Sequence, residues 1–219
     1  MSQPGPILVC FAVKEEAKPF LERSRDRDHI RILITGMGKK NAEESLLRQL
    51  AIERPAAVLT CGFAGGLRDD LETGAVLFFV DEHKELERAL ISASAKPAKF
   101  CCVPKVAATS HEKRTLTKET GADAVEMESE IICRVCKSQG IVSATVRVVL
   151  DTANEDLPLD FNSLMTPEHR MRYGKLATTL LKKPGKISAL LQFQKQCGLA
   201  AEKLADVLAK ITEQPTWLK

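Results

Sequence analysis

The sequence predicts an α/β fold in which helices cover both faces of a sheet. Short apolar runs alternate along the chain with segments of helical periodicity, which is typical of such a sheet. The apolar runs are continuous and rich in branched residues, as expected of strands covered on both faces. The chain has 219 residues, enough to bury a core without disulfides or a metal. We expect residues 1–219 to form a single domain.

Seven segments have the length and composition of central strands. They are Ile7–Val13, Ile30–Thr35, Ala57–Cys61, Ala75–Val80, Phe100–Val103, Ala124–Met127 and Val142–Leu150. Thr73-Gly74 predicts a turn just before the fourth of them.

Helices are expected between and after these strands. Asn41, followed three residues later by Glu44, predicts the cap of a helix over Ala42–Glu53. Ser129–Gln139 carries apolar residues along one side and precedes a glycine, which also predicts a helix. Two further helices are expected near the end of the chain, after a polar loop or lid over Ala153–Pro167. They are Glu168–Lys182 and Ile187–Ile211, separated by a Lys-Pro-Gly break.

The charge and cysteine content exclude several classes of protein. The formal net charge is only +3, and no block of one sign dominates, so we expect no nucleic-acid partner. The seven cysteines lie mostly in apolar runs, which indicates buried thiols in a reducing compartment. Cys133 and Cys136 form a C-x-x-C, but no second Cys/His pair follows at zinc spacing. We therefore expect no metal and no cofactor.

The chain carries no recognisable targeting or membrane segment. Its N-terminus has no basic region before the first apolar stretch, unlike a signal peptide, and no run reaches transmembrane length. We expect a cytoplasmic protein.

Chemistry-bearing residues follow five of the predicted strands. In an open α/β sheet, ligands bind beyond the carboxyl ends of the strands. The segments that follow these ends are Lys14-Glu15-Glu16, Gly36-Met37-Gly38, Gly62-Phe63-Ala64-Gly65-Gly66, Glu128 and Asp151. The sequence therefore predicts a site at one edge of the sheet, built from acids and glycine turns.

Each of these features also has a simpler interpretation. Glu16, taken alone, is more simply interpreted as a solvated charge in the first turn of a helix, and the Gly-x-Gly as a tight turn without a ligand. The second glycine segment matches neither a dinucleotide fingerprint nor a Walker A loop. Asp151 is also expected as an ion-pair partner of Arg147 or as a helix cap.

Four segments together resemble the signature segments of the purine nucleoside phosphorylase and nucleosidase superfamily. They occur in the same order, over about residues 6 to 160. The segments are Gly36-Met37-Gly38-Lys39-Lys40-Asn41-Ala42, Gly62-Phe63-Ala64-Gly65-Gly66-Leu67, Ala124-Val125-Glu126-Met127-Glu128-Ser129 and Arg147-Val148-Val149-Leu150-Asp151. The most specific of them is the Val-Glu-Met-Glu-Ser segment with Arg-x-x-x-Asp downstream.

Two further likenesses lie within this superfamily. The segment Phe11-Ala12-Val13-Lys14-Glu15-Glu16 resembles the start of methylthioadenosine/adenosylhomocysteine nucleosidases. The tract from Lys113 to Pro158 is similar in layout to hopanoid-associated phosphorylase-like proteins, which are proposed to act on adenosylhopane. The resemblance implies a three-layer α/β/α fold of the phosphorylase/hydrolase-like kind, with a central mixed sheet, in a homodimer or larger homo-oligomer.

The resemblance also implies roles for the acids and for the residues beside them. Asp151 would donate a proton to N7 of the purine, and Glu16 would position and deprotonate the attacking water. Glu128 would accept hydrogen bonds from the ribose hydroxyls, and Met127 would pack on the sugar. The other expected substrate contacts are Gly62, Phe63, Ala64 and Gly65 beside the ribose, Val125 and Glu126 next to Met127, and Ser110 near the base.

The chain departs from the family pattern at several positions. Leu150 stands where the family usually has serine, which removes a hydroxyl that helps to orient the acid. Phe63 replaces a small or polar residue. The span Asp81–Lys99 is shorter than in nucleosidases, where it supplies aromatic contacts to the base and the 5′ tail.

The predicted function is cleavage of the N-glycosidic bond in a purine nucleoside, with adenine as the favoured base. Hydrolysis is favoured because Glu16 would repel phosphate. Two alternatives remain open: a phosphorylase in which Lys39 or Arg68 helps to bind phosphate, and a catalytically silent nucleoside-binding protein. The expected partner is a small-molecule nucleoside, with phosphate as a second candidate.

Overall fold

A computed structural model describes residues 5–166, 172–182 and 185–218. The strands in this part of the chain are β1 (Ile7–Phe11), β2 (Ile30–Ile34), β3 (Ala57–Gly66), β4 (Val76–Val80), β5 (Lys96–Pro97), β6 (Phe100–Cys102), β7 (Ala124–Glu126) and β8 (Val142–Asp151). The helices are α1 (Lys14–Arg23), α2 (Lys39–Ile52), α3 (Lys84–Ser92), α4 (Ser110–Thr120), α5 (Ser129–Ser138), α6 (Phe161–Leu164), α7 (Tyr173–Lys182) and α8 (Lys186–Glu213), followed by a 3-10 turn at Thr216–Leu218.

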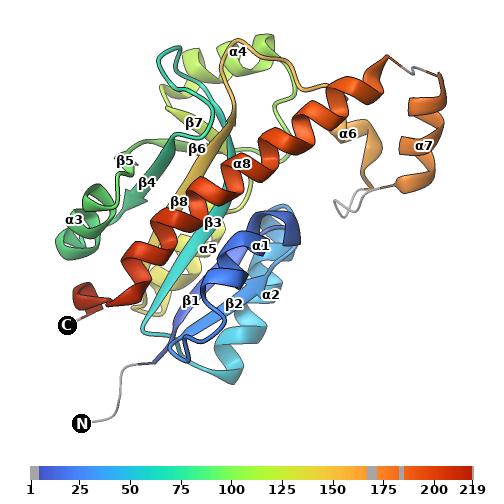
Figure 1. The fold of residues 1–219 in the computed structure, drawn as a ribbon. Helices are drawn as coiled ribbons and strands as arrows, with labels where there is room; N and C mark the ends of the chain where they lie inside the picture. Colours follow the sequence, from blue (N-terminus) through green and yellow to red (C-terminus); the bar gives the residue numbers. More distant parts are fainter. Residues whose placement is uncertain (1–4, 167–171, 183–184, 219) are drawn as a thin grey trace.

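The strands form one mixed sheet in the order β2-β1-β3-β8-β4-β5, and β7 joins β6 to β3 (Figure 1). β1, β2, β3 and β8 are mutually parallel, so their carboxyl ends share one edge of the sheet. β4 and β7 run antiparallel to β8 and β3, respectively. The predicted α/β class with a central mixed sheet is confirmed.

Helices pack on both faces of the sheet, which gives three layers (Figure 1). Successive side chains of a strand point to opposite faces. Ile7 and Val9 of β1 therefore belong to the larger core beneath α1, α3 and α8, whereas Leu8 and Cys10 belong to the smaller core beneath α2 and α5. Because both faces of the strand are covered, its sequence is a continuous apolar run.

All seven predicted strands are present, with ends that shift by one or two residues in most cases. The large difference is β3, which runs five residues beyond its predicted end. The segment from Gly62 to Gly66, which we expected to be a loop, therefore continues the strand. It pairs with β8 and, at Gly65 and Gly66, with β7. Hydrogen bonding to two neighbouring strands outweighs the weak strand preference of glycine.

Two of the predicted helices begin where expected, and one does not. α5 and α8 start within one residue of their predicted starts. The cap predicted at Asn41 is wrong, because α2 begins at Lys39 with Gly38 as its cap, and the Asn41 side chain instead donates to Met37 O. The start predicted at Glu168 and the break at residues 183–184 lie outside the described residues.

The polar segment after β8 is not entirely irregular, because α6 interrupts it. The N-terminal half of α8 extends beyond the sheet (Figure 1), where its Phe193 ring lies against Phe161 of α6, and α6 in turn contacts α7. The predicted turn at Thr73-Gly74 is present, and Gly74 has a φ of +85°. None of the helices in the described ranges is both long and apolar enough to cross a membrane.

Candidate functional site

Glu16 lies in the first turn of α1, directly after β1. Its Oε2 accepts hydrogen bonds from the backbone N–H groups of Ala12 and Val13, at 3.0 and 3.2 Å. Its Oε1 accepts from Phe63 N, at 2.9 Å, which ties the start of α1 to the far end of β3. The side chain is buried. The simpler interpretation of Glu16 as a solvated charge is therefore wrong.

The glycine turn after β2 contacts Glu128. Gly36 and Gly38 have φ values of +83° and +85°, which explains the need for glycine at both positions. Gly38 caps α2, and its N–H donates to Oε1 of Glu128 at 2.8 Å. The positive end of the α2 dipole therefore faces the carboxylate of Glu128, which lies between β7 and α5. The turn is thus part of the site and not merely a connection.

The carboxylate oxygens of Glu126, the last residue of β7, are bound by other residues of the chain. Its Oε2 accepts from the backbone N–H groups of Glu128 and Ser129, at 3.0 and 2.8 Å, and its Oε1 accepts from the Ser129 hydroxyl at 2.7 Å. Arg147 Nη2 lies 2.5 Å from the same Oε2. These contacts hold the start of α5 and leave Glu126 little capacity to bind a substrate directly.

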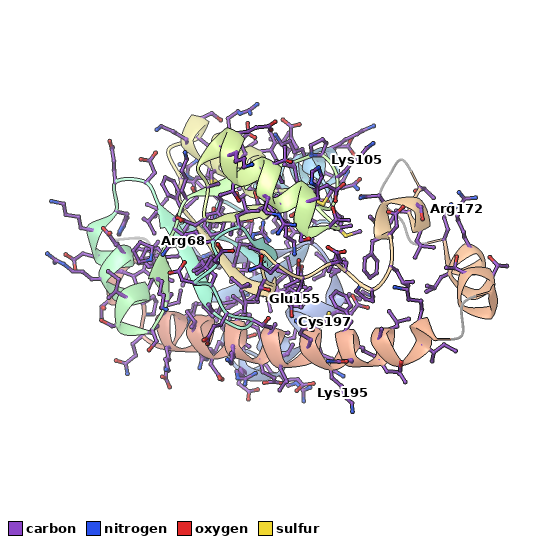
Figure 2. All side chains as sticks on the ribbon, turned by 90° about the horizontal axis from the view of Figure 1, so that it is seen from above. Arg68, Lys105, Glu155, Arg172, Lys195 and Cys197 are labelled. Carbon is purple, nitrogen blue, oxygen red and sulfur yellow. The ribbon has the colours of Figure 1, made fainter. Side chains whose placement is uncertain are left out.

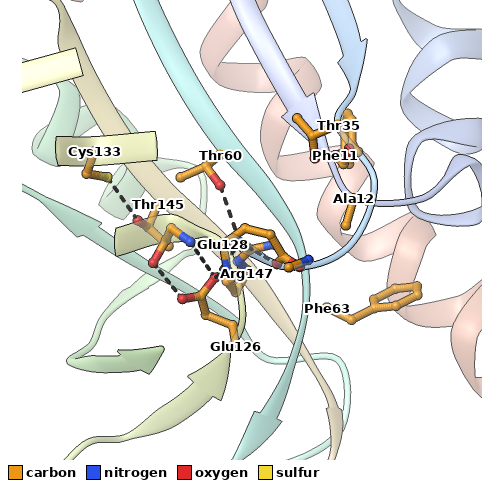
Figure 3. Close-up of polar contacts among 12 residues, drawn as sticks. Phe11, Ala12, Thr35, Thr60, Phe63, Glu126, Glu128, Cys133, Thr145 and Arg147 are labelled. Carbon is orange, nitrogen blue, oxygen red and sulfur yellow. Dashed lines mark hydrogen bonds and ion pairs between the residues drawn. The ribbon is translucent and has the colours of Figure 1, made fainter. Parts of the chain in front are cut away.

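Arg147, in the middle of β8, joins the carboxylates (Figure 3). Its guanidinium is only 1% exposed, and its Nη2 also lies 3.3 Å from Thr60 Oγ1 and 3.5 Å from Glu128 Oε2. A Cβ atom added at Gly62 would lie 2.6 Å from Arg147 Nη1 and 2.7 Å from Glu16 Oε1. Gly62 therefore leaves the space in which Arg147 approaches Glu16. We call Glu16, Glu126, Glu128 and Arg147 the carboxylate cluster.

The electrostatics of the carboxylate cluster favour proton exchange near neutral pH. Burial raises the pKa of Glu128 to about 7; the guanidinium of Arg147 opposes this effect, while Glu126 and Glu16 add to it. Burial likewise raises the pKa of Glu16, against the charge of Arg147 and three backbone donors. The pKa of Glu126 is lowered, because Arg147 and its hydrogen bonds outweigh the cost of burial. One cation therefore does not neutralise three carboxylates.

Asp151, at the end of β8, lies beside the end of β3 but pairs with a different cation. Its Oδ2 forms an ion pair with Lys113 Nζ. Lys113 belongs to α4, and its side chain has no exposed surface. Burial raises the pKa of Asp151 and the Lys113 ammonium works against that rise. The pairing of Asp151 with Arg147 that the sequence left open is therefore wrong, because Arg147 binds the cluster.

The remaining residues expected to contact substrate lie around the end of β3. Val125 faces Gly65 across the β3–β7 pair, and a Cβ atom at Gly65 would lie 3.1 Å from Val125 Cγ1 and 3.6 Å from Asp151 Oδ2. Ala64 and Met127 are buried. Phe63 is half-buried and packs against the core beneath α8. Gly65 thus lies next to Asp151, as Gly62 lies next to Glu16.

Ser110 is the first residue of α4, a helix that we did not predict. The signal was present in the sequence, since Thr109 and Glu112 form a capping box at its start. Ser110 N donates to Asp156 Oδ1 at 2.7 Å, so Ser110 contacts the loop after Asp151. The neighbouring His111 is exposed.

Sequence analysis also missed Lys113, the partner of Asp151. In α4, Lys113 shares one side with Leu116, Thr117 and Thr120, because residues three, four and seven apart lie on one face of a helix. A lysine on the inward face of a helix is the signal that would have identified it.

Leu150 stands where the family usually has serine, and its side chain does not face the proposed site. Its side chain is buried in the core beneath α8, and its carbonyl accepts from Gln196 Nε2 at 2.7 Å.

Cys133 lies 3.6 Å from the Thr145 hydroxyl and is free, as is Cys136. Within the described ranges, no group of three or more His, Cys, Asp or Glu side chains is arranged to hold a metal.

One family model matches part of the chain. Residues 80–182, a little less than half of the chain, match the model of the phosphorylase superfamily. These residues include Lys113, Glu126, Glu128, Arg147 and Asp151. No curated protein matches the chain.

Solved structures match the chain over nearly its whole length. A 5′-methylthioadenosine/S-adenosylhomocysteine nucleosidase from Helicobacter pylori, bound to butyl-thio-DADMe-Immucillin-A, has a TM-score of 0.73 at 17% identity and covers 97% of this chain and 100% of its own. Futalosine hydrolase from the same organism has a TM-score of 0.72 at 17% identity, over 96% and 98%. An S-adenosylhomocysteine nucleosidase from Streptococcus pyogenes, in complex with 5-methylthiotubericidin, has a TM-score of 0.71 at 14% identity, over 98% and 99%.

The chain has the fold of these nucleosidases. The phosphorylase/hydrolase-like architecture expected from the resemblance is therefore confirmed.

Proposed function

We propose that this chain is a member of the nucleoside phosphorylase and nucleosidase superfamily and hydrolyses the N-glycosidic bond of a purine nucleoside, with adenine as the favoured base. One observation carries the proposal: the carboxylate cluster and Asp151 lie at the same end of β3, with Gly62 beside the cluster and Gly65 beside Asp151. The matching superfamily model and the fold support it. A homodimer or larger homo-oligomer remains part of the proposal.

The proposed mechanism uses one carboxylate for each step. Breaking the bond between the ribosyl carbon and the base leaves positive charge on the sugar, and the nearby negative charge of Glu128 stabilises it. Glu128 Oε2, which has only a 3.5 Å contact with Arg147, accepts hydrogen bonds from the ribose hydroxyls. The bonding electrons go to the purine, whose N7 takes a proton from Asp151. Water then bonds to the ribosyl carbon.

Glu16 is proposed to take the proton of this attacking water. A carboxylate has about four acceptor positions, and backbone N–H groups occupy three of those on Glu16. The remaining position is the one proposed for water. The backbone donors fix the carboxylate in place, so it needs no rearrangement when the water arrives.

The charge of the carboxylate cluster favours water over phosphate as the nucleophile. Three carboxylates surround one guanidinium, so the cluster repels an anion. The cations that could bind phosphate already have carboxylate partners: Lys39 lies 2.5 Å from Glu130, and Arg68 pairs with Asp70 and Asp123. A catalytically silent nucleoside-binding protein is the second candidate, favoured by the ion pair between Lys113 and Asp151, which stabilises the unprotonated acid.

Release of adenine from methylthioadenosine, adenosine and a 5′-extended adenosine tests the proposal. We expect the wild-type protein to release the base, and Asp151→Asn to lower the rate on the order of 100-fold or more, because the amide has no proton to give. Asp69→Asn, which changes an exposed aspartate bonded to Asn154, is the matched control and should keep the rate. Measurable binding without base release from any nucleoside would favour the silent protein, and an unchanged rate in Asp151→Asn would remove Asp151 from the mechanism.

A further inference from the structure

Lys113 is a charged group without access to solvent, directly beside the proposed acid. Its side chain is fully buried, and Nζ donates to Thr152 O at 2.6 Å and to Glu155 O at 2.8 Å. Its third contact is the ion pair with Asp151 Oδ2. Two of the three protons of the ammonium are thus donated to carbonyl groups, and its charge is paired with that of Asp151.

The arrangement acts on both the position and the charge of Asp151. The two carbonyl contacts fix the chain immediately after β8, because Thr152 follows Asp151 and Glu155 lies three residues further. The ion pair occupies Oδ2, which leaves Oδ1 as the oxygen available to a ligand. The carboxylate supplies the counter-charge that a fully buried ammonium requires. Because Lys113 belongs to α4 and Asp151 ends β8, the ion pair also ties the carboxyl group to a second element of the fold.

We propose that Lys113 is a positioning residue for Asp151: it fixes which carboxyl oxygen faces the substrate, and its charge governs the protonation of that carboxyl group. The effect on catalysis rests on the proposed function, whereas the effect on Asp151 does not.

Three titratable groups interact electrostatically with Asp151. Lys113 of α4 lowers its pKa, and Glu155 of the following loop raises it. The third is the Cys197 thiol of α8 (Figure 2), whose own pKa burial raises to about 11, with contributions from Glu16 and Asp151. The thiol therefore stays neutral at physiological pH, and the protonation of Asp151 depends on the balance between burial and Lys113.

Titration of the Asp151 carboxyl carbon by NMR measures this balance directly. In Lys113→Met, which keeps an unbranched side chain but removes the charge, we expect the pKa of Asp151 to rise by about 1 unit or more. Lys118→Met, an exposed lysine of the same helix, is the matched control and should leave the titration unchanged. Equal Asp151 pKa values in the two variants would overturn the proposal.

The wild-type protein offers a second measurement in case Lys113→Met does not fold. The ¹⁵Nζ resonance of Lys113 should move with pH in a step that coincides with the titration of Asp151. Asp151→Asn should abolish that step. A step that persists in Asp151→Asn, or no step in the wild type, would show that the two groups are not coupled.

The pH profile of kcat separates positioning from a structural role. Under the proposed function Asp151 must be protonated, so activity falls above its pKa. We expect Lys113→Met to lower the maximum kcat about tenfold, because the carboxyl group is no longer held in position, and to move this alkaline limb to higher pH, because the pKa of Asp151 rises. A purely structural role would lower kcat at every pH and leave the limb in place, which would contradict the proposal. Absence of base release from the wild type would refute the proposed function, while the NMR titration would still decide the role of Lys113.

Discussion

Glu128 is the residue whose charge is most sensitive to conditions near neutral pH. It is buried among Arg147, Glu126 and Glu16, and these surroundings raise its pKa to about 7. Its Oε1 is bound by Gly38 N. The carboxylate is ionised above pH 7 and increasingly protonated below it, so its ability to accept hydrogen bonds from ribose falls with the pH.

The affinity for a nucleoside should therefore depend on pH. For a non-cleavable purine nucleoside with both ribose hydroxyls, we expect Kd to rise about tenfold for each pH unit well below 7, because the ionised fraction falls by that factor. Calorimetric titration between pH 5.5 and 8 measures this change. Glu128→Gln should bind weakly and without this dependence. A wild-type Kd that is constant over the range would show that ionised Glu128 does not hold the ribose.

At the residue scale, the acids were predictable from the sequence but their partners were not. Glu16, Glu128 and Asp151 each follow a strand, and strand ends meet at one edge of the sheet. The pairing of Asp151 with Lys113 depends on how α4 packs over that edge. Helical spacing marks Lys113 as an inward-facing residue of α4, but no local pattern determines its long-range contact with Asp151.

At the scale of elements, β3 and β8 carry the site between them. Gly62 of β3 lies opposite Arg147 of β8 in register, and its φ of +151° is a conformation that side chains rarely adopt. The sequence showed that glycines are concentrated after Cys61, but not that the strand continues through them. Continuation depends on pairing with β7 and β8, which are distant in sequence.

Gly62→Ala should disrupt this close approach. The new Cβ atom would collide with the guanidinium of Arg147 and the carboxylate of Glu16, so we expect a loss of about 2 kcal/mol in the free energy of unfolding and loss of activity. Gly198→Ala in α8, where nothing lies within 4 Å, is the control and should be neutral or stabilising by up to about 1 kcal/mol. Denaturant unfolding measures both variants. An undiminished stability in Gly62→Ala would contradict the described geometry.

Arg147→Met should make stability depend steeply on pH. Without the guanidinium, three buried carboxylates are unpaired, so their folded-state pKa values lie above the unfolded ones and stability falls as the pH rises above about 4.5. We expect a loss of about 3–5 kcal/mol at pH 8 and a smaller loss at pH 5.

Arg134→Met is the matched control, since Arg134 is exposed and pairs with Glu130 on α5. Its stability should stay within about 0.5 kcal/mol of the wild type at both pH values. Thermal unfolding at the two pH values is the measurement. A loss in Arg147→Met that is the same at pH 5 and pH 8 would mean that the carboxylates are not the cause.

At the scale of the whole molecule, the layered architecture was predictable because continuous apolar strands require cover on both faces. The direction of β7 was not predictable. We expected the site from carboxyl ends that point the same way, yet β7 runs antiparallel to β3, and Glu128 reaches the site through its contacts with Gly38 and Arg147. Five strand ends therefore meet as expected, but for a partly different reason.

Incubation in ¹⁸O-labelled water distinguishes hydrolysis from phosphorolysis. The wild-type protein is incubated with methylthioadenosine or adenosine, with and without phosphate, and the mass of the sugar product is measured by mass spectrometry. We expect a free sugar that carries one ¹⁸O atom, formed at the same rate in both conditions, because the negative carboxylate cluster admits water rather than phosphate. A sugar phosphate that forms only when phosphate is present would contradict it.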